Sequence, residues 1–200
     1  MQTIPLVEYF KPYLKTFVEE ASNDGDVTPE NVLQEGHPKS RQLLYSIMED
    51  ILEDGSEFRN ANYVSDFLKQ VKGGKKGVIL AEHYSNFDYP MFAYLLEKTG
   101  ADGKELIDLT YAIAGIKLSE ENKYISALAA AFNRIFIYPS LSIEKITDEK
   151  EKEEIFKKAK AINIASMRAM DKLRTSGHPI LVFPSGTRYR PGKPETKKGR

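Results

Sequence analysis

The sequence predicts an α/β protein in which a small N-terminal helical bundle precedes a mostly parallel sheet flanked by helices. Two observations carry this prediction. Residues 1–72 hold apolar residues at helical spacing and no run typical of a strand. Residues 76–200 alternate short apolar runs with longer amphipathic stretches, which is the pattern of strands connected by helices. Because the glycines and lysines at 73–77 separate the two parts, we expect domains over 1–72 and 76–200.

Four amphipathic helices are expected in the first part of the chain. Their apolar stripes predict helices over 6–17, 28–33, 44–52 and 63–71. The second of these depends on Thr28 and Pro29, which together are typical of an N-cap and a first-turn proline. Glycines follow the last two stripes and mark where those helices end.

The second part is predicted to alternate strands with helices. Strands are expected over 77–81, 109–114, 135–138 and 180–183, with helices over 91–96, 125–132 and 155–173. The run at 77–81 is apolar without interruption, which is typical of a strand buried on both faces. Such an order favours a largely parallel sheet, since a helix between two strands returns the chain to the same end.

Composition excludes several classes of protein. The chain has 29 basic and 29 acidic residues, and this balance argues against a nucleic-acid binder. It has no cysteine, which excludes disulfides, thiolate metal sites and a cysteine nucleophile. No stretch reaches the roughly 20 apolar residues of a transmembrane helix, and the N-terminus lacks the pattern of a signal peptide. We therefore expect a soluble, intracellular protein, with the cytoplasm as its compartment.

A first candidate site follows the predicted strand at 77–81, because open α/β sheets bind ligands beyond the carboxyl ends of their strands. On one helix, His83 and Asp88 would point about 140° apart, so they meet only across a strand-to-helix turn. Asp88 would then fix one imidazole nitrogen and leave the other as a base. Alternatively, Asp88 or Asn86 caps the next helix and His83 is an ordinary loop histidine.

A second candidate site follows the predicted strand at 180–183. Arg188 and Arg190 come after a Pro-Ser-Gly turn, and arginine side chains with turn N–H groups suit a phosphate or carboxylate. The spacing of a nucleotide-binding P-loop is absent. A solvated basic loop is the alternative. His37 and His178 each precede a proline and are interpreted as turn residues.

Together these motifs resemble the glycerolipid acyltransferase family. The likeness lies in the order of H-x-x-x-x-D, a strand ending at Tyr138, a long helix and the string Pro-Ser-Gly-Thr-Arg-Tyr-Arg-Pro at 184–191. This string is most similar to that of the soluble, chloroplast-type glycerol-3-phosphate acyltransferases, which also begin with a helical bundle. The resemblance implies the plastid stroma as the compartment if the source is a plant. Their chains continue with further strands, so the resemblance implies that the α/β domain is incomplete at its C-terminal end.

The resemblance implies a reaction and assigns roles. His83 would take the proton from the sn-1 hydroxyl of glycerol 3-phosphate, and Asp88 would orient His83. The oxygen would attack an acyl thioester on acyl carrier protein or coenzyme A, with no metal or cofactor. Arg188 and Arg190 would hold the phosphate. The residues expected to line the substrate pocket through backbone or hydroxyl groups are Ser185, Gly186 and Thr187.

Two departures from the family pattern leave the acceptor open. Glu82 stands where the family usually has asparagine, and residues 139–142 stand where plant-type members have a Lys-Lys-His cluster. Arg134, Lys145 or Lys123 would replace that cluster, or the acceptor is held differently.

Three alternatives to the glycerol-3-phosphate reaction also stay open. One is acyl transfer to 1-acyl-glycerol 3-phosphate or another alcohol. A second is a non-catalytic module that binds acyl carrier protein or anionic lipid, and a peripheral membrane contact is compatible with either. A third is a metal site, for which His83 and Asp88 supply only two of the three or four protein ligands that zinc needs.

Overall fold

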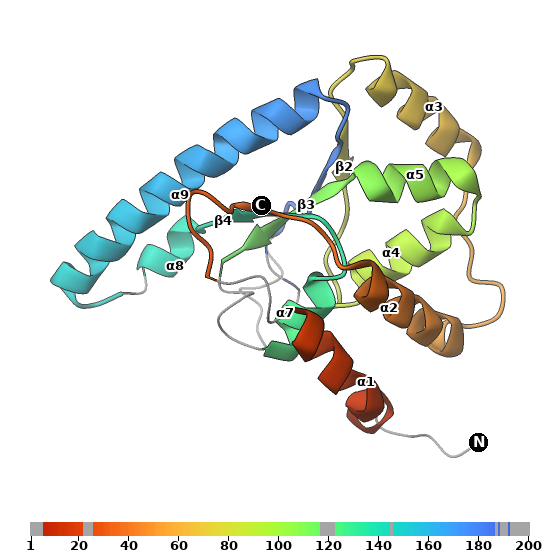
Figure 1. Cartoon of the computed structure of the whole chain (residues 1–200), viewed down its shortest axis with the longest axis horizontal. Coiled ribbons are helices and arrows are strands. Elements are labelled where there is room, and N and C mark those ends of the chain that lie inside the picture. The colour runs from red at the N-terminus through yellow and green to blue at the C-terminus, as the bar shows by residue number, and fades with distance from the viewer. Residues whose placement is uncertain are drawn as a thin grey trace.

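A five-stranded sheet between helices forms the centre of the molecule, which confirms the α/β class (Figure 1). The structure is a computed structural model that describes residues 6–21, 26–116, 123–144, 146–186, 188 and 192. The helices are α1 (Leu6–Ala21), α2 (Pro38–Ile51), α3 (Asn62–Lys72), α4 (Asp88–Glu97), α5 (Ala101–Leu109), α7 (Lys123–Ala129), α8 (Ser140–Glu144) and α9 (Glu149–Thr175). The strands are β1 (Leu33–Gln34), β2 (Val78–Leu80), β3 (Tyr111–Gly115), β4 (Arg134–Ile137) and β5 (Ile180–Val182).

The sheet has the strand order β1-β4-β3-β5-β2, and all its pairings are parallel except that of β1 with β4. β2 and β5 pair with Leu80 beside Val182, and β3 and β4 pair with Gly115 beside Ile137. The four parallel strands therefore end at one edge of the sheet. Both candidate sites follow strands that end there, which is where ligands bind in open α/β sheets.

The long helix α9 packs against the sheet on the side opposite α2, α4 and α5 (Figure 1). Its N-cap is Asp148, whose carboxylate accepts a hydrogen bond from the backbone N–H of Glu151 at 2.8 Å. Ile162 packs in a cluster with Phe136, while Leu173 packs in another with Ile180. Among the described helices, none combines the length and the apolar character needed to cross a membrane.

The helices of the first seventy residues share one apolar core with helices of the second part. This cluster contains Phe17 of α1, Leu44 of α2 and Val64 of α3, together with Leu96 of α4 and Leu106 of α5. The N-terminal helices therefore pack on the elements that carry the candidate site. Whether residues 1–72 and 76–200 are separate folding units stays a prediction.

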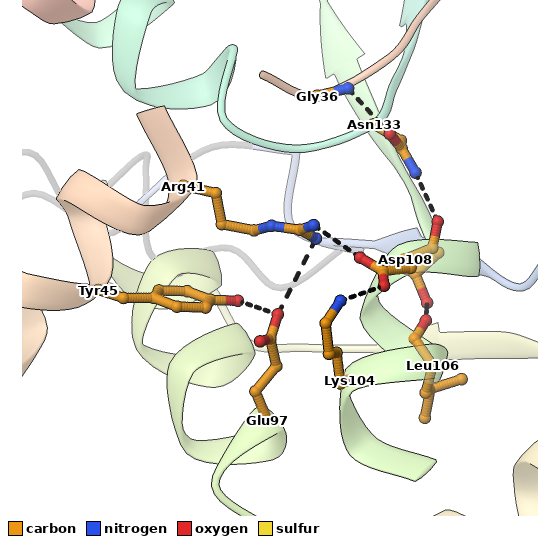
Figure 2. Close-up of polar contacts among 9 residues, drawn as sticks. Gly36, Arg41, Tyr45, Glu97, Lys104, Leu106, Asp108 and Asn133 are labelled. Atoms are coloured by element: carbon orange, nitrogen blue, oxygen red, sulfur yellow. Dashed lines mark hydrogen bonds and ion pairs between the residues drawn. The ribbon is translucent and has the colours of Figure 1, made fainter. Parts of the chain in front are cut away.

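A half-buried network of charges joins α2 to α4 and α5 (Figure 2). The Arg41 guanidinium lies 2.6 Å from Asp108 and 3.9 Å from Glu97. The Tyr45 hydroxyl donates to Glu97 at 2.7 Å, and Lys104 pairs with Asp108 at 2.6 Å. Partial burial by itself raises the pKa of Asp108, but hydrogen bonds from Lys104 and Arg41 outweigh it, so the pKa lies below its usual value.

The prediction of a helix over 28–33 is wrong, because this segment holds a single turn followed by β1. The Thr28 backbone N–H donates to the Asn31 side chain at 2.7 Å, and the Asn31 N–H returns to the Thr28 carbonyl at 3.2 Å. Beyond this turn, the carbonyl of Val32 accepts the N–H of Phe136 at 2.9 Å. Pairing with β4, which is remote in sequence, thus replaces the helix that Thr28 and Pro29 suggested.

The prediction that residues 77–81 are buried on both faces is also wrong. β2 is an outermost strand of the sheet, and its side chains Val78 and Leu80 are 48% and 68% exposed. The predicted strand over 109–114 begins later, at Tyr111, because Leu109 still belongs to α5. The short helices α5 and α8 were not predicted. Gly103 weakens the helical pattern of α5, yet α5 requires it, because a Cβ there would lie 2.0 Å from the Leu96 carbonyl oxygen.

Candidate active site

The loop at 81–87 connects β2 to α4 at the carboxyl edge of the sheet. It begins in register with β5, because the Ala81 N–H donates to the Val182 carbonyl at 3.0 Å. It then turns through Ser85, whose hydroxyl accepts the Phe87 N–H at 3.0 Å. Asp88 is the first residue of α4, where a negative charge is favoured by the helix dipole.

This turn brings the His83 and Asp88 side chains together. Nδ1 of His83 lies 2.8 Å from Oδ2 of Asp88, and the two side chains are 23% and 13% exposed. The same carboxylate oxygen accepts the backbone N–H groups of Tyr84 at 2.7 Å and Ser85 at 2.8 Å. All three donors precede α4, so helix capping does not account for the position of the carboxylate.

The arrangement leaves the second imidazole nitrogen for chemistry. When Asp88 accepts a hydrogen bond from Nδ1–H, the neutral ring carries its lone pair on Nε2. The described residues make no hydrogen bond to Nε2. An imidazole held in this way can act as a general base toward a hydroxyl group placed at Nε2.

Glu82 and Tyr84, which flank His83, bond to one another. The Tyr84 hydroxyl donates to the Glu82 carboxylate, and this hydrogen bond raises the pKa of Tyr84. Both side chains are exposed, with Tyr84 68% exposed. The charge of Glu82, which departs from the family pattern, therefore has a partner other than His83.

The Pro-Ser-Gly segment forms a turn directly beyond β5. The Gly186 N–H donates to the Phe183 carbonyl at 2.9 Å, and Gly186 has φ +63°, a conformation that favours glycine. This N–H is thus already bonded within the turn. The Ser185 hydroxyl oxygen is shielded from solvent and has no hydrogen-bond partner among the described residues.

Phe183, which the sequence motifs singled out only as the end of a strand, contacts His83. Their ring centroids lie 4.5 Å apart, with an angle of 31° between the planes. The sequence signal for this contact was the aromatic residue just before Pro-Ser-Gly. The contact itself could not be predicted, because it depends on β2 and β5 being neighbours in the sheet. The loop of the first motif and the turn of the second motif therefore meet.

The structure places only part of the predicted phosphate site. Arg188 is half-buried and follows β5, the strand that pairs with β2. Thr187 and Arg190 lie outside the described residues. Arg134 cannot replace the missing basic cluster, because it lies at the amino end of β4 and is 3% exposed. Lys145 also lies outside the described residues. Lys123 is the first residue of α7.

The other histidine near the sheet belongs to its opposite edge. His178 precedes β5, and its Nδ1 lies 3.0 Å from the Leu109 carbonyl oxygen. Its ring also packs edge-on against Tyr111. Within the residues that the structure describes, no group of three or more His, Cys, Asp or Glu side chains could hold a metal ion.

A His–Asp pair at the carboxyl edge of a mostly parallel sheet, beside a Pro-Ser-Gly turn, forms a candidate site for general-base chemistry. The profile of the family described as Acyltransferase matches residues 56–199. The chain therefore belongs to the acyltransferase family. A search of the curated proteins finds no match. The matched residues include both candidate sites and extend from α3 past β5.

Proposed function

We propose that this acyltransferase transfers an acyl group from a thioester of acyl carrier protein or coenzyme A to the sn-1 hydroxyl of glycerol 3-phosphate. The observation that carries the proposal is the 2.8 Å contact between His83 and Asp88 beside the turn at Ser185. A general base oriented by a carboxylate suits an acceptor that carries a reacting hydroxyl group.

In the proposed reaction, Nε2 of His83 takes the proton of the acceptor hydroxyl as its oxygen attacks the thioester carbonyl. Asp88 stabilises the imidazolium that forms. When the tetrahedral intermediate collapses, the carbon–sulfur bond breaks and the thiolate takes the proton back from Nε2. The products are 1-acyl-glycerol 3-phosphate and a free thiol, and the base returns to its neutral form. General-base help of this kind contributes roughly 10² to 10⁴ in rate.

Arg188 is proposed to bind the acceptor phosphate, together with Arg190. A guanidinium group presents a planar pair of donors that matches phosphate oxygens. Arg188 lies six residues beyond Val182, and the strand that ends at Val182 pairs with β2, which precedes His83. In the same proposal, Ser185, Gly186 and Thr187 line the acceptor pocket through backbone or hydroxyl groups.

The test measures ester formation and thiol release on the chain with glycerol 3-phosphate and acyl thioesters. Because the chain has no cysteine, a thiol reagent reports only the thiol of the donor. His83→Gln is expected to abolish activity. His37→Gln serves as the matched control, since His37 precedes α2 and bonds through its N–H to Ala130, near the amino end of β4. The proposal fails if no acyl-glycerol 3-phosphate forms with any donor.

The identity of the acceptor is the second question, and one observation bears on it. Arg134 is buried at the amino end of β4, so it cannot supply phosphate contacts at the carboxyl edge. This bears equally on glycerol 3-phosphate and 1-acyl-glycerol 3-phosphate, which carry the same phosphate, and favours only an alcohol without one. An acceptor series of all three kinds, compared by kcat/KM, distinguishes them. A non-catalytic module for acyl carrier protein or anionic lipid would instead keep its binding in His83→Gln and lose it in Arg188→Glu.

A further inference from the structure

The contact between His83 and Phe183 has a role that the family motifs do not define. We propose that Phe183 is a positioning residue, which holds the imidazole ring of His83 by its face while Asp88 holds it by its edge. The inference rests on the proposed role of His83 as the base. It concerns orientation, because Phe183 has no group that could exchange a proton with the substrate.

One hydrogen bond does not fix the plane of an imidazole ring. The bond from Nδ1 to Asp88 sets the direction of one nitrogen and the tautomer, but changes in χ1 and χ2 can still tilt the ring within the angular tolerance of one hydrogen bond. Such a tilt swings Nε2 through an arc. A second contact, on the ring face, removes this freedom. Phe183 supplies it, with centroids 4.5 Å apart and planes tilted by 31°.

Phe183 is well placed to act as a rigid support. It follows β5, which lies between β3 and β2 in the sheet. Its neighbour Val182 accepts the Ala81 N–H at 3.0 Å, and its own carbonyl accepts the Gly186 N–H at 2.9 Å. His83 lies in a loop without strand pairing. The rigid strand end thus supports the ring of the less constrained residue.

The magnitude follows from the cost of misplacing a reacting atom. A displacement of about 1 Å can lower the rate roughly 100-fold, because the near-attack geometry is lost. Replacing Phe183 by leucine keeps an apolar group but removes the flat aromatic face. We expect Phe183→Leu to lower kcat by about 10- to 100-fold, with KM within about threefold because substrate contacts are kept. Phe183→Tyr keeps the ring and should recover most of kcat.

A measurement without substrate tests the contact separately from the reaction. The chain has three histidines, so a His83→Gln spectrum assigns the ring protons of His83 by nuclear magnetic resonance. Stacking on Phe183 should shift these protons upfield. The shift should disappear in Phe183→Leu and persist in Phe183→Tyr, while the tautomer set by Asp88 stays unchanged. Phe58→Leu is the matched control, since Phe58 also pairs with an aromatic ring, that of Phe92 at 6.0 Å.

The outcomes separate the two proposals. Loss of the ring shift together with lower kcat in Phe183→Leu, and recovery of both in Phe183→Tyr, supports the positioning role. Identical His83 ring shifts in the wild type and Phe183→Leu would overturn it, as would an unchanged kcat. If the wild type forms no ester at all, the proposed function fails, whereas the ring shifts still decide whether Phe183 holds the histidine.

Discussion

Replacing Asp88 by asparagine removes a charge beside His83 while keeping the size of the side chain. The Asp88 oxygen that accepts the His83 ring also accepts the N–H groups of Tyr84 and Ser85. An amide oxygen can still accept those two backbone N–H groups. The loop should therefore keep its shape, and the thermal midpoint should change little, since a charge at a helix N-terminus contributes about 0.3–1 kcal/mol.

The effect on the reaction should be much larger than the effect on stability. In the transition state the imidazole gains a positive charge, whose centre lies about 4 Å from that of the carboxylate. With an effective dielectric constant of about 20, which suits side chains 23% and 13% exposed, the attraction is about 4 kcal/mol. The amide dipole recovers part of this energy. A net loss of about 3–4 kcal/mol corresponds to a fall in kcat of roughly 10²- to 10³-fold.

The assay follows thiol release at saturating donor and acceptor. Asp66→Asn is the matched control, because Asp66 is an exposed carboxylate on α3. The double variant His83→Gln/Asp88→Asn should be no slower than His83→Gln alone, since Asp88 acts through His83. A kcat for Asp88→Asn within about threefold of the wild type, alongside an inactive His83→Gln, would refute the reasoning.

Three further predictions concern stability. Gly103→Ala should destabilise the fold by more than about 2 kcal/mol, although alanine usually favours a helix, because its Cβ would lie 2.0 Å from a backbone carbonyl; urea unfolding measures this. Asp108→Asn should be less stable than the wild type at neutral pH. Because the folded pKa of Asp108 is depressed, this difference should vanish as pH falls below about 4, and a growing gap would contradict it. Ile162→Ala, at a fully buried site, should lower the free energy of unfolding by about 2–5 kcal/mol. Ile164→Ala, at a site that is 41% exposed, should lower it by less than about 1 kcal/mol. Equal losses of stability in thermal unfolding would refute the packing of α9 on the sheet.

Elements whose apolar pattern is long or strongly periodic could be predicted from the sequence. The stripes that lead to α2, α3 and α9 give the positions of those helices, and the short apolar runs give β2, β4 and β5. Local sequence signals predicted the wrong secondary structure where a segment pairs with a strand that is remote in the sequence. The segment before Leu33 has the signals of a helix start, but its backbone pairs with β4. No local signal distinguishes these outcomes, because the competing hydrogen bonds come from residues about 100 positions away.

The candidate site was predictable to a similar degree. The residue types of the H-x-x-x-x-D motif identify a base and a carboxylate, and the turn requirement follows from helix geometry. The two N–H groups that fix Asp88 could not be predicted, because they depend on the exact path of the loop. The same holds for the Ser185 hydroxyl, whose burial is a property of the surrounding fold.

The sequence by itself determines the family of this chain, its α/β class and the two motifs that carry chemistry. It does so because residue types and their spacing persist in any arrangement of the strands. Only the tertiary structure decides that β2 and β5 are neighbours, and hence that Phe183 meets His83. It also decides that Val78 and Leu80 of β2 face solvent. Strand order is set by packing among segments far apart in the chain, and local periodicity does not encode it.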